Sequence, residues 1–205
     1  MPPSQATDGF DFTLHVGRLC ADIAVRLPEL RHVDMRKVAV RFCQIRKGVS
    51  HGLQASLTPL RFLDGERTTL RRGQTWAIQR VLDAAGQEML YLLSFYLPRF
   101  LDRPLSDKLN TVFHELWHIS PRFDGDLRRL PGRCYAHGAS QHAFHAEMEP
   151  LVQRWLALSP PEETYGFLRH DFRQLVERHG PVYGTRYPTP KLVRVDPTGK
   201  LAGPK

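Results

Sequence analysis

The segment that most constrains how this chain can fold is residues 105–119, where apolar side chains recur at helical spacing and two histidines follow near the end. The apolar positions are Leu105, Leu109, Val112, Phe113 and Leu116. Pro104 precedes the segment, and Ser106 and Asp107 lie in its first turn, as is common where helices begin. We therefore predict an amphipathic helix that needs a second layer of structure to cover its apolar face.

The last turns of this predicted helix contain the motif His114-Glu115-x-x-His118. Histidines four residues apart lie on one face of a helix, so both imidazoles can reach one Zn²⁺. The Glu115 carboxylate, one position further round, can take a proton from a metal-bound water without binding the metal. With 10 His and 9 Glu in 205 residues, chance placement gives only about 0.02 such motifs. We therefore predict that His114 and His118 bind zinc and that Glu115 is the catalytic base.

A catalytic zinc site needs a third protein ligand and an open position for water. The residue six positions after His118, where metzincins carry a histidine, is Asp124, which disfavours that class. We favour His137 as the third ligand because it ends a long loop that can return over the helix. The alternatives left open are His142, His145, Glu147 and, as a soft ligand, Cys134.

Before residue 105 the sequence predicts one helix followed by two hairpins. Apolar residues recur at helical spacing from Phe12 to Leu30, and Pro28 marks the expected end of this helix. Strands are expected where apolar and polar residues alternate, with turn-forming residues between the members of each pair. The predicted pairs are residues 38–45 with 53–58, and residues 75–82 with 88–97.

After the predicted helix at 105–119, a loop rich in Gly, Pro and Arg occupies residues 121–138. Helices are predicted at 140–158 and 162–178, and a short strand at 191–195. This order predicts an α+β fold in which a small mixed or antiparallel sheet packs on the helix at 105–119, with additional C-terminal helices. We expect one domain over residues 1–180 and a basic, Pro- and Gly-rich C-terminal tail over 181–205.

The composition excludes several classes of protein. Hydrophobic residues make up 41% of the chain and charged residues 24%, which argues against a largely disordered chain. The longest apolar run, residues 89–97, is too short to cross a bilayer as a helix, and the N-terminus lacks the pattern of a secretory signal. Cys20, Cys43 and Cys134 are too few for a disulfide framework. We expect a cytoplasmic protein that does not contact membranes.

The net charge of +8, from 29 Lys and Arg against 21 Asp and Glu, leaves room for an anionic partner. An alternative function is therefore a basic nucleic-acid-associated protein, in which the zinc site is structural or the protease acts on DNA-bound proteins. No helix-turn-helix, zinc-finger or RNA-binding signature accompanies the basic residues. The residues considered for phosphate contacts are Arg67, Arg71, Arg72, Arg128, Arg129, Arg186, Lys191, Arg194, Lys200 and Lys205, with Trp76 near them in the sequence.

The stretch Phe113-His-Glu-Leu-Trp-His-Ile-Ser-Pro-Arg-Phe-Asp-Gly125, followed by a Gly-Arg-x-x-x-His-Gly segment, resembles the phage-type zinc metallopeptidases. These are a zincin group related to SprT-like proteins, and the resemblance covers roughly residues 35–158. It implies a small mixed sheet packed against the active helix, Zn²⁺ bound by His114, His118 and a downstream histidine, and Glu115 as the catalytic acid and base.

The expected function is therefore a zinc metallopeptidase that hydrolyses peptide bonds in a protein or peptide substrate. Zincin peptidases commonly bind extended substrates along a sheet edge beside the active helix. The strand predicted at 88–97 is the first candidate for this scaffold, although its apolar run equally suits a buried strand without a free edge. The candidates for stabilising the oxyanion are Arg133, Tyr135 and Tyr183, and spacing does not choose among them.

Overall fold

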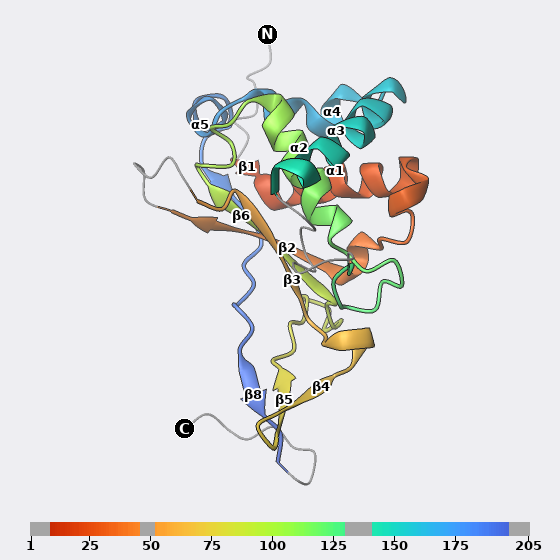
Figure 1. Ribbon diagram of the computed structural model, residues 1–205. Helices are drawn as coiled ribbons and strands as arrows, with labels where there is room; N and C mark the ends of the chain where they lie inside the picture. The colour runs from red at the N-terminus through yellow and green to blue at the C-terminus, as the bar shows by residue number, and fades with distance from the viewer. Residues whose placement is uncertain (1–8, 46–51, 130–140, 197–205) are drawn as a thin grey trace.

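The computed structural model describes residues 9–45, 52–129 and 141–196, with the side chains of residues 141–147 outside the description. It is an α+β protein in which the helices gather around one face of a three-stranded sheet (Figure 1). The strands of this sheet are β2 (Val38–Gln44), β6 (Tyr91–Leu97) and β3 (Ala55–Pro59). Strand β6 lies in the centre, parallel to β2 and antiparallel to β3.

The central position of β6 follows from its sequence, because a strand that is apolar on both faces is stable only where both faces are covered. Tyr91, Leu93 and Phe95 are fully buried in the core between the sheet and the helices. Leu92 is equally buried on the opposite face, in a smaller cluster that includes Val81. The sequence allowed either a strand with a free edge for a substrate or a buried strand without one. The structure confirms the buried strand, because β6 is paired on both sides.

Both predicted hairpins are wrong in their strand pairing. Strands β2 and β3 do not pair with each other, because β6 inserts between them. In the second predicted hairpin only the isolated bridge between Leu82 and Glu88 forms. Alternation and turn residues predicted the strands correctly, but turn signals favour local partners, whereas the apolar run of β6 is covered only in the centre of the sheet.

The helices match the predicted periodicity more closely. Helix α1 (Phe12–Arg26) begins at Asp11, whose carboxylate accepts a hydrogen bond from the Leu14 backbone N–H at 3.0 Å. It ends before Pro28, as predicted. Helix α2 (Leu105–Trp117) and helix α3 (Gln141–Ala157) confirm the two predicted at 105–119 and 140–158.

The helix predicted at 162–178 is divided into three short elements. They are α4 (Glu162–Tyr165), a 3₁₀ turn (Gly166–Arg169) and α5 (Phe172–His179). Asp171 begins α5 with a capping box, since its carboxylate accepts from the Gln174 N–H while the Gln174 side chain accepts from the Asp171 N–H. The apolar spacing continues across this cap, which is why periodicity alone merged the two helices.

A second three-stranded sheet extends away from the helices (Figure 1). It contains β4 (Thr68–Arg71), β5 (Gln74–Ile78) and β8 (Leu192–Arg194), all antiparallel, with β5 in the centre. Strand β8 confirms the short strand predicted at 191–195, whereas β4 lies in an arginine-rich stretch where no strand was expected. Strand β1 (Phe10–Asp11) pairs in parallel with β7 (Val182–Tyr183), so residues 182–194 pack against the rest of the chain.

Two of the three cysteines lie within the described residues. Cys20 is fully buried and Cys43 is half-buried, and both are free thiols. Burial raises the pKa of Cys20 to about 12, which makes this thiol inert. Among the helices that the structure describes, none combines the length and the apolar character needed to cross a membrane.

Candidate metal centre

Helix α2 places the three motif residues inside the protein. Leu109, Val112, Phe113 and Leu116 fix its orientation by facing the core, each at most 2% exposed. The motif residues border this apolar face, and His114, Glu115 and His118 are 8%, 7% and 7% exposed. Polar side chains are rarely this buried without a partner or a function, so the burial marks these three residues as candidates.

The two histidines converge as their spacing predicts. Their Nε2 atoms lie 2.9 Å apart, and the ring planes meet at 83° with centroids 4.5 Å apart. Two nitrogen ligands of one tetrahedral zinc are separated by about 3.3 Å, because each Zn–N bond is about 2.0–2.1 Å long. The pair would have to open by only about 0.4 Å, so these residues fit a zinc ion.

Glu115 points from α2 toward strand β3. Burial raises the pKa of Glu115 to about 7, and a hydrogen bond from the backbone N–H of Leu57 opposes this shift. Leu57 lies in the middle of β3. The carboxyl group of the motif therefore meets the edge of the main sheet.

The edge of β3 that faces α2 can be identified from the hydrogen bonds on its other side. The carbonyl of Gln54 accepts from the Tyr96 N–H at 2.9 Å, and the Leu60 N–H donates to the Leu90 carbonyl at 3.0 Å. The backbone groups of the even-numbered residues of β3 therefore bond to β6. Because the direction of the N–H and C=O groups alternates along a strand, those of the odd-numbered residues, including Leu57, point away from β6. No strand among the described residues pairs with this outer edge. The free edge beside the motif thus belongs to β3, and not to the strand at 88–97 that the sequence suggested.

The loop after α2 folds back along the end of the helix. Ile119 forms an isolated bridge with Leu127, and the Arg128 N–H donates to the His118 carbonyl at 2.7 Å. The hydroxyl of buried Tyr91 donates to the Asp126 carbonyl at 2.9 Å and accepts from the Gly125 N–H at 3.0 Å. The chain therefore leaves the described region at residue 129 only a short distance from His118.

Arg128 and Arg129, considered above for phosphate contacts, have partners within the protein. The Arg128 guanidinium lies 4.1 Å from the centre of the Trp117 ring and donates to the Trp117 carbonyl at 2.7 Å. Burial lowers its pKa. Arg129 forms an ion pair with Asp126 at 3.0 Å. These contacts hold the loop against the helix, and they explain both arginines without a nucleic acid.

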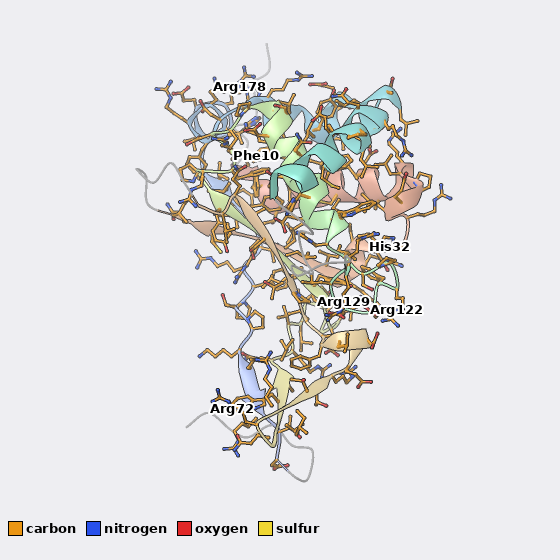
Figure 2. All side chains as sticks on the ribbon, viewed as in Figure 1. Phe10, His32, Arg72, Arg122, Arg129 and Arg178 are labelled. Atoms are coloured by element: carbon orange, nitrogen blue, oxygen red, sulfur yellow. The ribbon has the colours of Figure 1, made fainter. Side chains whose placement is uncertain are left out.

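No pattern in the sequence indicated His32, which lies beside the same loop (Figure 2). The carbonyl of Ile119 accepts a hydrogen bond from His32, while the Nε2 atom of His32 is buried without a partner among the described residues. Burial, together with the positive charge of Arg128, lowers the pKa of His32. His32 therefore supports the C-terminal end of the motif helix as a neutral side chain.

The predicted third ligand lies outside the described residues, as do Cys134 and the side chains of His142, His145 and Glu147. Within the described part of the chain, no group of three His, Cys, Asp or Glu residues is close enough to hold a metal ion. Helix α3 is joined to α2 by a hydrogen bond from the Asn110 amide to Glu149, at 2.9 Å. The choice between a loop histidine and an α3 ligand therefore stays a prediction.

Of the candidates for stabilising the oxyanion, only Tyr183 is described. It lines a groove beside β2, at the edge of the sheet opposite β3, so it is removed from the motif. No family model, curated protein or solved structure matches this chain. Its function must therefore be argued from the chemistry of the site.

Proposed function

We propose that the protein is a zinc-dependent metallopeptidase with a zincin-like arrangement of sheet and active helix. The observation that carries this proposal is the convergence of the His114 and His118 Nε2 atoms, 2.9 Å apart, next to a buried carboxyl group. A structural zinc site closes all four positions with protein ligands and has no use for an adjacent carboxylate. Glu115 therefore favours a catalytic site.

His114, His118 and a third residue, for which we favour His137, would hold the zinc ion. When bound, zinc would polarise the scissile carbonyl and lower the pKa of an attacking water. Glu115 takes the proton from this water and returns it to the leaving nitrogen. Its burial excludes bulk water, which strengthens electrostatic interactions at the reacting atoms.

The outer edge of β3 would align the substrate. An extended peptide can pair with a free strand edge through its backbone, which positions a peptide bond independently of its side chains. The Leu57 N–H on this edge donates to Glu115, so a substrate paired with the Ala55 backbone and the Leu57 carbonyl would be adjacent to the base. On this proposal the substrates would be extended, unfolded segments, because only these can pair with a strand edge.

The test is chelator-sensitive hydrolysis of fluorescently labelled, unfolded casein by the zinc-loaded chain. Glu115→Gln keeps the size of the side chain but removes the base, so activity should fall by about 10²–10⁴-fold. Glu163→Gln, on the exposed surface of α4, is the matched control and should retain full activity. Chelator-sensitive activity that survives Glu115→Gln would disprove the assigned role of Glu115.

A second candidate function is binding of single-stranded nucleic acid by the β4–β5–β8 sheet. The pairing register places Thr69, Trp76 and Arg194 side by side on one face, and Arg71 lies on this same face two residues after Thr69. Both arginines are exposed. A half-buried tryptophan between cations is typical of surfaces that stack bases and neutralise phosphates.

Anisotropy of a labelled oligothymidylate tests this second candidate. Trp76→Ala should weaken binding by roughly tenfold, and Arg71→Gln should reduce the dependence of affinity on salt. Arg18→Gln, an exposed arginine on α1, is the control for net charge. Equal binding by all three variants would remove this surface as a nucleic-acid site.

A further inference from the structure

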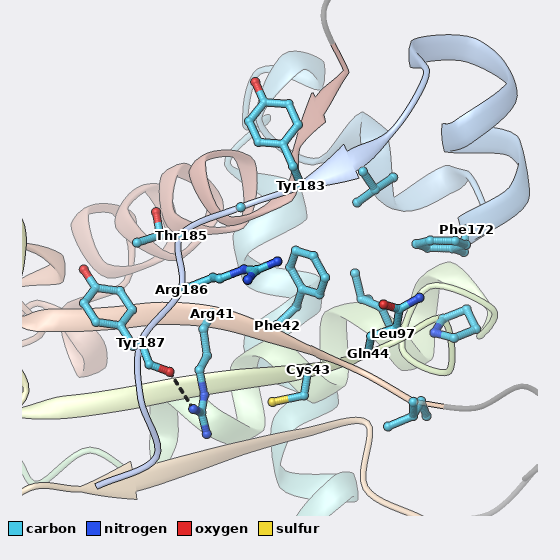
Figure 3. A pocket seen from close by; sticks show the side chains of 14 residues that line it. Arg41, Phe42, Cys43, Gln44, Leu97, Phe172, Tyr183, Thr185, Arg186 and Tyr187 are labelled. Carbon is cyan, nitrogen blue, oxygen red and sulfur yellow. Dashed lines mark hydrogen bonds between the residues drawn. The ribbon is translucent and has the colours of Figure 1, made fainter.

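A groove runs along the edge of the main sheet opposite the candidate metal centre. It lies between β2 and residues 182–187 and has a volume of about 890 Å³ (Figure 3). One part of its lining is apolar and includes Phe42, Leu97 and Phe172. Another part is cationic, with Arg41 and Arg186. The groove is large enough for several residues of an extended chain.

The backbone of β2 presents unpaired hydrogen-bonding groups to this groove. The Lys37 carbonyl accepts from the Leu90 N–H at 2.9 Å, and the Ile45 N–H donates to the Leu97 carbonyl at 2.9 Å. The backbone N–H and C=O groups of the odd-numbered residues of β2 therefore point toward β6. Those of the even-numbered residues, including Phe42 and Gln44, point toward the groove. No strand among the described residues pairs with this edge. Such an edge is a template for an added strand.

The charge of the groove is positive. Arg41 donates to the Ser94 hydroxyl at 2.9 Å and to the Tyr187 carbonyl at 2.8 Å, so its side chain is held in place by neutral acceptors. Arg186 is exposed and extends toward the ring of Phe42 (Figure 3). Among the described residues that line the groove, none is Asp or Glu. Both guanidinium groups are therefore available to a carboxylate.

We propose that this groove binds an extended, acidic peptide segment as an additional strand on β2. The alternating N–H and C=O groups at the edge match a peptide backbone, the arginines match acidic side chains, and the apolar part accepts a hydrophobic side chain. A nucleic acid would use the two charges but leave the strand edge unpaired. The site is independent of the proposed peptidase activity, because β2 and β3 form opposite edges of the sheet.

The charge part of the proposal is tested by fluorescence anisotropy with a labelled decapeptide in which Glu and Val alternate. All binding measurements use protein that carries Glu115→Gln, so that the proposed peptidase activity does not cleave the peptide. The acidic peptide should bind at least about tenfold more tightly than the same peptide with Gln in place of Glu. Adding Arg186→Gln should remove most of this preference, whereas adding Arg18→Gln should leave it unchanged. If the Arg186→Gln and Arg18→Gln variants preferred the Glu peptide over the Gln peptide to the same extent, the proposal would be overturned.

The strand-addition part is tested by Gln44→Pro, which removes an N–H on the groove side without removing a hydrogen bond to β6. It should weaken binding of both peptides by at least about fivefold, whereas Gln44→Ala should not. A peptide N-methylated at alternate residues gives the same test without changing the protein. It should bind to the unchanged groove no more tightly than the unmodified peptide binds to the Gln44→Pro variant. Unchanged binding in these experiments would overturn the proposal, as would displacement of the acidic peptide by oligothymidylate at lower concentrations than by unlabelled peptide.

Discussion

Glu115 on α2 accepts a hydrogen bond from the backbone N–H of Leu57 on β3, which joins the motif helix to the free edge of the main sheet. The contact brings the proposed base to the strand that would align a substrate. It also restricts where α2 can lie, because Thr111, one turn earlier, donates to the Gln54 side chain at 3.1 Å. Helix and strand edge therefore act as one unit in the proposed site.

The third zinc ligand gives a prediction with a clear ranking. His137→Ala should sharply weaken zinc binding, whereas His142→Ala and His145→Ala should have much smaller effects. Competition with a chromophoric chelator measures the affinity of each variant. If Glu147→Ala strips the metal instead, the third ligand is a carboxylate from α3 and the assignment of the loop histidine is wrong.

Tyr91→Phe should destabilise the protein by roughly 1–3 kcal/mol, because it leaves the buried Gly125 N–H without its partner and leaves the Asp126 carbonyl with only the 3.3 Å bond from the Ser120 N–H. Urea unfolding measures this loss. Tyr96→Phe is the control, since the half-buried Tyr96 hydroxyl makes only a 3.3 Å contact with Ser56 and its removal should cost less than about 1 kcal/mol. Equal stability of the two variants would contradict the role given to the Tyr91 hydroxyl.

The stability of the protein should depend on pH through Glu88. Burial alone raises the pKa of this carboxyl, but the hydrogen bond from Arg61 and the charges of Arg61, Arg67 and Arg80 together lower it below 4.5. A lowered pKa in the folded state means that Glu88 stabilises the protein above the unfolded-state pKa and loses this contribution as the pH falls.

The measurement compares unfolding free energies of the parent and Glu88→Gln at several pH values. The parent should be more stable above about pH 5, and the difference should shrink progressively as the solution becomes more acidic. A constant difference down to pH 3 would show that the ion pairs of Glu88 do not contribute as proposed.

The sequence was sufficient for three of the four predicted helices and for the pair of histidines at the centre of the site. Helical spacing predicted α1, α2 and α3, and the four-residue spacing of His114, in α2, and His118, at its C-cap, brought their Nε2 atoms together as expected. These features depend on residues close together in the chain, so a local pattern contains the information needed to predict them.

The sheets could not be predicted in the same way, because pairing depends on residues far apart in the chain. Insertion of β6 between β2 and β3 and the pairing of β8 with β5 are set by burial of whole faces, which turn residues do not reveal. For the same reason no local pattern could predict that the Leu57 N–H donates to Glu115 or that His32 donates to the Ile119 carbonyl after α2.

The most direct test of the proposed site is the zinc content of the purified chain after reconstitution and removal of free metal. The parent and Glu115→Gln should each contain one zinc per chain, because Glu115 lies beside the metal and does not bind it. His114→Ala and His118→Ala should contain close to none, while His170→Ala, a histidine outside the motif, should match the parent. Absence of zinc from the parent, or its retention when either motif histidine is replaced, would contradict the account.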